Sequence, residues 1–350
     1  MMNRTPVMIG LFVTALWPAA GRAGVQWGRS TEGRRSASLA FAAGQITALD
    51  GYVQETTRPY YDITDPEKNT LFAKSYTLEE LGFDGGYGTF GLLFDKAWSF
   101  FTLHAAGTYL NPSETSTADR DFYIGVEEVY YQGEKYEYMV IPDGETFKAD
   151  MEGGTLEMRG MLTPVSITGG DVVEITPSIG LGLNTFVSTF DIDAGRARGT
   201  VFYEAPPQEY VVGGHGKGWT GMILPELGVG LDVRMGGSTA DRRTPELVLQ
   251  GYYALLDFSG DTRDLGITSS RNNKVLNLEY DHFEARALLG IPMGRAVDLL
   301  VGVAVQHMKA NAEVLAEDRP PEEVEERREK FNKIVELEMT SVTFLAGLRF

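Results

Sequence analysis

The chain has 350 residues, a formal net charge of −18 and no cysteine. The lack of cysteine excludes disulfides, thiol nucleophiles and thiolate metal sites, and the acidity argues against nucleic acid as a partner. Glycine contributes 41 residues, about 12 % against a usual value near 7 %, which suits closely packed, curved sheets.

The first 23 residues are typical of a secretory signal peptide. Arg4 precedes an apolar run of 11 residues from Val7 to Trp17, and small residues follow up to Ala23. A membrane-spanning helix needs about 18 apolar residues, so this run is too short to be one. We expect cleavage after Ala23, within three residues. No later stretch is apolar enough for a spanning helix, so a membrane protein built from residues 24–350 would cross with strands.

Nine later segments alternate apolar and polar residues with the two-residue period of a strand. In the clearest of them, Ile175, Ile179 and Leu181 share one face, opposite Glu174 and other small or polar residues. The nine predicted strands are 85–95, 97–109, 155–167, 172–190, 219–234, 246–258, 275–290, 297–307 and 334–350.

The connections between these strands alternate in length. The short ones lie near residue 96 and at 168–171, 235–243 and 291–296. The long ones lie at 46–84, 112–153, 192–218, 259–273 and 316–333. Within the second long connection, residues 121–141 are compatible with a hairpin that turns at Gln132-Gly133, and its charges indicate that it projects above the barrel. The run 321–332 favours a short exposed helix or an acidic loop.

The last strand is apolar at every second position and ends on an aromatic residue. Val342, Phe344, Ala346, Leu348 and Phe350 share one face. This strand resembles the final strand of bacterial outer-membrane β-barrels, in which that end serves as the assembly signal. The resemblance implies that Phe344, Leu348 and Phe350 form such a signal, and that the partners are outer-membrane lipid and the barrel-assembly machinery.

The expected fold is therefore an all-β, transmembrane, antiparallel up-and-down barrel in the outer membrane of a diderm bacterium. Such barrels have even strand numbers, short periplasmic turns and long external loops. A tenth strand must precede the nine, and 36–45 is the best candidate, although 8 to 12 strands remain compatible with the pattern. The alternation of connections places Phe350 on the periplasmic side.

Charged residues fall on the predicted inner face of the barrel. In a barrel of about ten strands the lumen is narrow, so we expect paired charges that plug it. A thin water-filled path for small cations is the alternative. The predicted lumen charges are Glu174, Glu226, Asp232, Arg234, Glu284, Arg286, Asp298 and Arg349.

Three prolines lie inside predicted strands, where proline removes a hydrogen-bond donor of the sheet. Pro164 and Pro177 flank one short turn, and Pro225 lies toward the external rim. We expect all three at strand ends.

Signals for enzymatic activity or cofactor binding are weak. The four histidines form no HExxH pair, and no Gly-x-Ser-x-Gly elbow occurs. Asp281 and His282 are adjacent, and adjacent residues of a strand point to opposite faces. Omptin proteases place Asp and His pairs at the external rim, and the chain resembles them only in strand number. Asp191 and Asp193 lack the remaining ligands of a calcium loop, so divalent cations are expected only at acidic loops in general.

The leading functional hypothesis is a non-enzymatic barrel that anchors external loops for surface interaction or envelope structure. A narrow, cation-preferring porin is the second hypothesis, and a hydrolase with its site at the rim is the third. A soluble β-sandwich is the alternative that involves no membrane. No cofactor and no defined metal site is expected from the sequence.

Overall fold

The computed structural model describes eleven stretches of the chain. The predicted signal segment up to residue 22 and the predicted helix or acidic loop at 321–332 lie outside them. The described residues are 23–29, 36–55, 75–119, 122–131, 134–169, 173–201, 208–236, 244–261, 274–294, 297–316 and 333–350.

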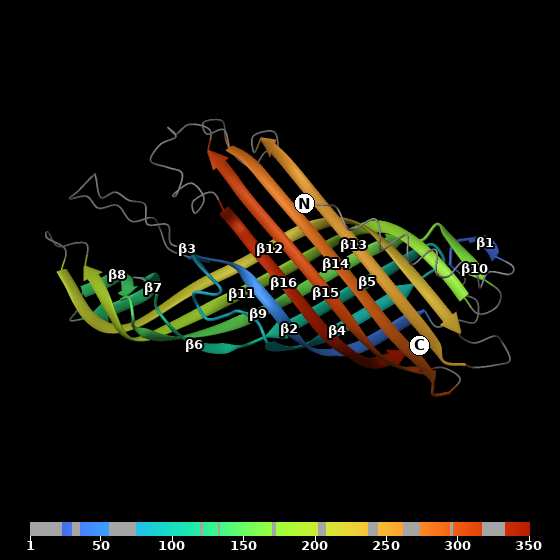
Figure 1. Cartoon of the computed structure of the whole chain (residues 1–350), viewed down its shortest axis with the longest axis horizontal. Helices are drawn as coiled ribbons and strands as arrows, with labels where there is room; N and C mark the ends of the chain where they lie inside the picture. The colour runs from blue at the N-terminus through green and yellow to red at the C-terminus, as the bar shows by residue number, and fades with distance from the viewer. Residues whose placement is uncertain are drawn as a thin grey trace.

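Ten antiparallel strands pair in a closed ring (Figure 1). They are β2 (Ala37–Glu55), β4 (Tyr87–Ala97), β5 (Phe101–Leu110), β9 (Thr146–Leu162), β11 (Val173–Val201), β12 (Gln208–Gly236), β13 (Glu246–Asp261), β14 (Lys274–Pro292), β15 (Asp298–Ala316) and β16 (Lys333–Arg349). Each pairs with the next ring strand along the chain, and β16 pairs with β2 to close the ring. The prediction of an all-β up-and-down barrel with ten strands, including the weak first strand, is confirmed.

The remaining described strands pair with the ring at its two ends. One end has short turns and contains the C-terminus, and we call it the short-turn end (Figure 1). There β1 (Ala23–Trp27) pairs with β10 (Val165–Gly169), which pairs with the start of β11. At the opposite, long-strand end, β3 (Ser75–Thr77) pairs with β2, and β6 (Ser113–Thr117) pairs with β9. No helix in the described stretches is long and apolar enough to cross a membrane.

The predicted hairpin in residues 121–141 exists and lies outside the ring. β7 (Phe122–Tyr131) pairs with β8 (Glu134–Ile141), and β8 pairs with β11 at Arg198–Thr200. These contacts place the hairpin beyond the ring at the long-strand end, so it adds no strand to the barrel.

Several ring strands run much further than the sequence predicted. β11 and β12 have 29 residues each and pair up to Val201 and Gln208. Most of the predicted connection 192–218 is therefore strand, and so are residues 46–55 of β2 and 146–153 of β9. The loop predictions were wrong for these residues. Where side chains are described, as at Ile46, Ala149 and Ile192, the apolar residues lie on the inner face rather than the outer face.

Two of the three prolines lie inside strands, where the sheet does not need their missing donor. Pro164 lies in the break between β9 and β10, as expected. Pro177 lies where the neighbour of β11 changes from β10 to β9. The pairing with β10 stops at Ile175, and the pairing with β9 starts at Ile179. Pro225 lies in 220–227 of β12, which has no described partner on the side of β13.

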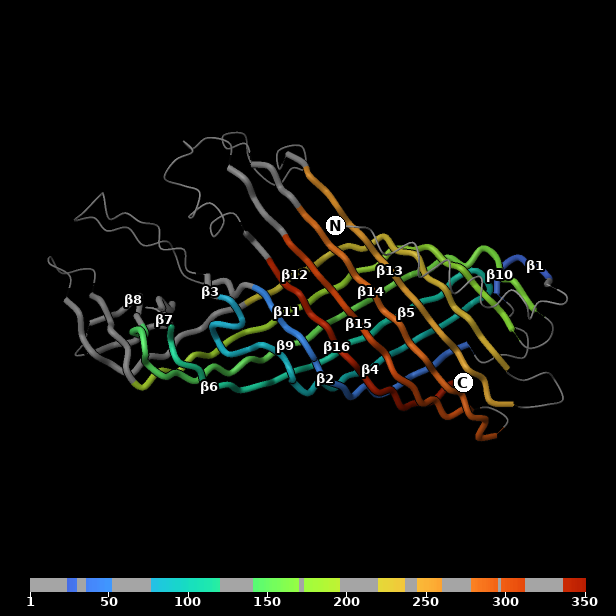
Figure 2. The backbone as a smooth tube through the Cα atoms, in the orientation of Figure 1, coloured from blue at the N-terminus to red at the C-terminus, as the bar shows by residue number. Residues whose placement is uncertain are grey.

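The ring opens between β12 and β13 toward the long-strand end. Their pairing stops at Gly228 and Ala254, although both strands continue. Beyond this point β12 reaches β2, where Trp219 pairs with Gln54. Figures 1 and 2 show β13 to β16 diverging at a clear angle from β11 and β12.

The wall of the barrel is apolar on its outside in the short-turn half. On β14, Phe283, Leu289 and Ile291 are exposed, and on β11 Leu181 is 68 % exposed. Other exposed apolar residues of this belt are Leu39, Phe41, Phe90, Leu92, Leu156, Met158, Leu162, Ile179, Leu183, Val187, Ile223, Leu227, Val229, Leu255, Phe344, Leu348 and Phe350.

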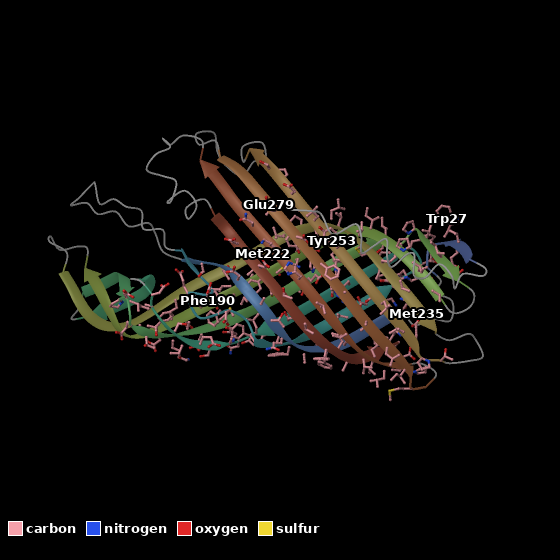
Figure 3. The ribbon with its side chains drawn as sticks, in the orientation of Figure 1. Trp27, Phe190, Met222, Met235, Tyr253 and Glu279 are labelled. Carbon is pink, nitrogen blue, oxygen red and sulfur yellow. The ribbon has the colours of Figure 1, made fainter. Side chains whose placement is uncertain are left out.

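The polarity of both faces reverses toward the long-strand end. On β9, Phe147, Ala149 and Met151 are buried between the exposed or half-buried Lys148, Asp150 and Glu152, whereas further along the strand Glu157 and Arg159 are buried. Figure 3 shows Glu279 toward the long-strand end and Trp27 and Met235 toward the short-turn end. The outer face is thus polar where the interior is apolar, and apolar where the interior is charged.

The apolar interior of the long-strand half is a packed core. Inward residues of the ring form it together with the turn after β3, whose Leu78, Leu81 and Phe83 are at most 2 % exposed. The ring centroid of Phe83 lies 5.7 Å from that of Phe190 on β11. This turn, which was predicted as part of the external connection 46–84, therefore fills the open end of the barrel.

Candidate functional site

A hydrogen-bonded set of polar side chains crosses the middle of the barrel, and we call it the mid-barrel network. Inward positions of β4, β5, β9, β11, β12, β13, β14 and β15 supply its members, so it joins most of the ring. Its residues are Asp95, His104, Glu157, Arg159, Asn184, Glu226, Tyr252, Tyr280, His282, Glu284, Arg286 and Gln306.

One side of the mid-barrel network is organised by Arg286. His104 Nδ1 lies 2.7 Å from Asp95 Oδ1, and His104 Nε2 lies 2.7 Å from Arg286 Nη2. Arg286 also donates from Nε to Glu284. Arg286 Nη1 also lies 3.2 Å from His104 Nδ1, so both ring nitrogens of His104 face the guanidinium.

The centre of the network is Arg159 of β9. Its guanidinium pairs with Glu157 on the same strand and with Glu284 on β14. The same group lies over the ring of Tyr252, 3.9 Å from its centroid, which is a favourable cation–π position. Glu157 lies two positions before Arg159 on β9, whereas Tyr252 lies on β13 and Glu284 on β14. Arg159 therefore connects β9 to a distant part of the barrel wall.

The other side of the network converges on Glu226. Its Oε1 lies 2.8 Å from His282 Nδ1 and accepts from Tyr280, while Oε2 accepts from Tyr252 at 3.0 Å. Asn184 Nδ2 lies 3.1 Å from the hydroxyl of Tyr280. Gln306 Nε2 lies 3.0 Å from His282 Nε2 and 3.4 Å from Glu157 Oε2, which connects the two sides.

A second layer of charges closes the short-turn end. Arg349 donates to Asp298 at 2.9 Å and also pairs with Glu246. Arg29, which follows β1, pairs with Asp232, so the segment before the ring contributes a charge to the lumen. Arg234 and Glu174 face inward beside them.

All eight lumen charges predicted from the sequence face the interior of the barrel. Glu226, Glu284 and Arg286 belong to the mid-barrel network, and the other five belong to the layer at the short-turn end. By contrast, Phe344, Leu348 and Phe350 lie on the outside and are 69 %, 47 % and 55 % exposed.

Sequence reasoning missed most partners of these charges. Asp95, His104, Glu157 and Arg159 are inward residues of strands whose alternation was weak, and Arg29 lies outside the ring. His282 was considered beside Asp281, yet its partner is Glu226, 56 positions away. Inward parity on the predicted strands signals all of these except Arg29.

A cavity of about 60 Å³ separates the two layers. Arg29 and Asp232 line it from the short-turn side, and Arg159, Tyr252 and Arg286 line it from the mid-barrel network. It has room for a few water molecules. Beyond the network, toward the long-strand end, the apolar core occupies the interior.

Two trios in the mid-barrel network have the residue types and spacing of a metal site. In each, one ligand atom per residue lies within 4.8 Å of the others. The trios are His104 with Glu157 and Glu284, and Glu157 with Glu226 and His282. All five residues are buried.

The outer polar face above the apolar belt carries simple surface ion pairs. A hydrogen bond from Lys148 Nζ lowers the pKa of Asp150. A hydrogen bond to Glu338, 3.0 Å away, raises the pKa of Lys309. Asp191 and Asp193 also face outward.

The described residues offer no acid–histidine pair at the rim. His104 and His282 pair with carboxylates inside the barrel and are at most 5 % exposed. His307 lies 3.0 Å from Thr340, and Asp281 lies 3.4 Å from the hydroxyl of Tyr253. The side chain of His215 lies outside the described residues.

Comparison with known proteins identifies no family. No protein-family model matches the sequence, and no curated protein matches it significantly. One similar solved structure is the outer membrane protease OmpT from Escherichia coli, which is 10 % identical, with coverage of 90 % of this chain and 96 % of that chain and a TM-score of 0.39. A match at this level carries no argument, so the fold rests on the strand pairing itself.

Proposed function

We propose that the chain is an outer-membrane β-barrel with a filled interior, which holds its long hairpins at the cell surface and catalyses no reaction. The observation that carries this proposal is the polarity reversal along the ring strands. A wall that is apolar outside and charged inside suits lipid, whereas a wall that is polar outside and apolar inside suits water.

The height of the apolar belt supports a membrane position. On β14 the exposed apolar residues run from Phe283 to Ile291, and on β11 they run from Ile179 to Val187. Both stretches have nine residues, and a tilted strand needs about 9–11 to cross the hydrocarbon core. A soluble monomer rarely exposes so large an apolar surface.

The orientation follows from the family resemblance of the last strand. Its end, with Phe350, lies at the short-turn end (Figure 1), which would be the periplasmic side. Phe344, Leu348 and Phe350 face the lipid in this arrangement, so they are available to the barrel-assembly machinery. The long strands then rise from the outer surface of the cell.

The proposed anchoring role rests on the unequal lengths of the ring strands. β11 and β12 have 29 residues each, while β4 and β5 have 11 and 10. At about 3.3 Å per residue, the additional length extends far beyond a membrane, and β7 and β8 add to it. The interior, in contrast, is filled by the apolar core and by ion pairs.

Accessibility on intact cells tests this proposal. An epitope inserted between Val201 and Gln208 should be detected on unpermeabilised cells, and one inserted between Gly236 and Thr244 should be detected only after permeabilisation. Purified protein should need detergent and should show a heat-dependent gel shift. Solubility without detergent would contradict the membrane location.

A narrow cation-preferring channel is the second candidate, because carboxylates outnumber guanidiniums among the inward charges. Planar-bilayer recordings separate the two. Reproducible single-channel steps from refolded protein would contradict a filled interior, and a silent bilayer would support it.

A further inference from the structure

We propose that the mid-barrel network binds one divalent metal ion through Glu157, Glu226 and His282. These residues are 4 %, 2 % and 0 % exposed, and their ligand atoms lie within 4.8 Å of one another. They come from β9, β12 and β14, so the ion would join three strands across the lumen. This inference concerns the interior and goes beyond the proposed anchoring role.

The mid-barrel network contains more carboxylates than guanidiniums. Asp95, Glu157, Glu226 and Glu284 provide four carboxylates, and Arg159 and Arg286 provide two guanidiniums. The carboxylates therefore exceed the guanidiniums by two. Buried charges must be paired or must coordinate a metal, and one divalent cation supplies the missing charge.

The two histidines of the mid-barrel network have different neighbours. Both ring nitrogens of His104 face Arg286, with Nε2 2.7 Å from Nη2 and Nδ1 3.2 Å from Nη1. His282 Nδ1 faces Glu226, and its Nε2 faces the amide nitrogen of Gln306, which also points at Glu157 Oε2. Among the described residues no guanidinium bonds His282, which lies between Glu226 and Gln306.

The surroundings distinguish this trio from the other one. In the trio of His104, Glu157 and Glu284, guanidinium groups already bond His104 and both oxygens of Glu284. In the proposed trio Glu157 pairs with Arg159, but among the described residues no guanidinium bonds Glu226 or His282, whose partners are Tyr252, Tyr280 and Gln306. A cation is therefore expected on the side of Glu226.

An independent observation also indicates a missing group here. Asn184 is 0 % exposed and donates from Nδ2 to Tyr280, which bonds Glu226. Its Oδ1 has no hydrogen-bond partner among the described residues. A buried amide oxygen without a donor is costly, and water carried by a hydrated ion is a donor suited to this position.

The donor set defines the class of ion. Two carboxylates and one imidazole suit Zn²⁺ or Mn²⁺ and exclude the soft ions that require thiolates. Tyr252, Tyr280 and Gln306 would hold the ligands in place, as the neighbours of metal ligands commonly do. The ion would strengthen the barrel by neutralising its interior.

The test uses the full mature chain in detergent micelles. After dialysis against a chelator, Zn²⁺ or Mn²⁺ alone is added, weakly bound ion is removed on a desalting column, and the retained metal is measured by mass spectrometry. We expect about one equivalent, together with a rise in the temperature of the heat-dependent gel shift. Less than 0.2 equivalents with no such rise would overturn the proposal, and would indicate that protonated histidine balances the charge.

Variants separate this site from the acidic surface. Glu157→Gln and His282→Gln should lose the retained equivalent, while Glu174→Gln in the second charge layer and His307→Gln on the outer face should keep it. Retention by both ligand variants would overturn the proposal. If those variants do not fold, the titration of the unmodified chain still decides it. The gel shift before metal addition reports the barrel itself, so failure of the membrane-barrel proposal is recognised separately.

Discussion

The two halves of the barrel interior are filled in opposite ways. In the short-turn half, inward carboxylates and guanidiniums pair in two layers around a small cavity. In the long-strand half, residues such as Phe190, Met308 and Leu337 form an apolar core, which the turn containing Phe83 completes. On β9, β11 and β14 the same alternate positions point inward in both halves, whereas on β2 a bulge shifts the inward positions from Ala42 and Ile46 to Leu49.

The difference fits the proposed membrane position, in which the two halves of the outer face meet lipid and water. Where the outer face is covered with apolar side chains, the inner face is free to be polar, because lipid provides no hydrophobic drive toward the lumen. Where the outer face carries Glu279 or Lys309, folding needs an apolar interior, as in a soluble protein. In the proposed membrane position, the short-turn half of the barrel would face lipid and the long-strand half would face water.

Removing a guanidinium from the charged half should lower the free energy of unfolding most. Arg159→Met leaves Glu157 and Glu284 without their guanidinium, and removing one partner of a buried pair costs about 3–5 kcal/mol. Lys148→Met, on the same strand but in an exposed pair with Asp150, should cost about 0–1 kcal/mol. Urea titration of the folded fraction in lipid vesicles measures both. Equal losses would mean that the mid-barrel network does not support the barrel.

Creating a cavity in the apolar half should cost almost as much. Phe190 is 1 % exposed, and Phe→Ala in a core costs about 3–5 kcal/mol. The control is Val187→Ala on the same strand, because Val187 is 49 % exposed on the outer face. The free energies of unfolding from urea titration should differ by at least about 2 kcal/mol. A difference near zero would contradict a packed core in this half.

An arginine introduced on the outer face should lower stability in the apolar belt and have little effect above it, which locates the boundary between the two halves. Ala287 lies halfway along the apolar belt of β14, where arginine should cost about 2–4 kcal/mol. Glu279→Arg lies on the same face of the same strand but above the belt, and should change stability little. The fraction folded into vesicles, read from the heat-dependent gel shift, compares them. Similar yields for the two variants would contradict a lipid-facing belt.

The smallest effect is expected at the outer polar face. Glu338→Gln removes the partner of Lys309, and such exposed pairs contribute about 0–1 kcal/mol. Because Glu338 raises the pKa of Lys309, this contribution is complete below the unfolded-state value of about 10.4 and disappears as the pH rises through the higher folded-state value. Unfolding measured from pH 8 to 11 should therefore converge for the two proteins. The control Glu279→Gln, which removes no described ion pair, should show no such convergence.

Strand number and the inward position of the lumen charges could be predicted because the strands of the short-turn half alternate between an apolar outer face and a polar inner face. A single apolar outer face gives the clear alternation of 172–190, and the parity of the last strand fixes which residues face outward. Glu226 and Arg286 were assigned to the lumen from this parity alone, and both are inward in the structure.

The rest could not be predicted, because each part depends on contacts between distant residues. Beyond Phe190, β11 keeps the strand period but has Ile192 and Ala194 on its inner face and Asp191 and Asp193 on its outer face, so it was interpreted as a loop. The partner of His282 depends on the register of β12 against β14, through β13. Likewise, the insertion of Leu78 and Phe83 into the mouth of the barrel leaves no local pattern in the sequence.

The chain contains no cysteine, so the central claim is open to direct measurement. Single cysteines on the outer face of β14, at positions 279, 281, 283, 285, 287, 289 and 291, would carry a spin label in lipid vesicles. Collisions with oxygen, which concentrates in lipid, and with a water-soluble nickel complex would then be compared at each position. The account predicts water exposure at 279 and 281 and lipid exposure from 283 to 291. Water exposure at all seven positions would contradict it.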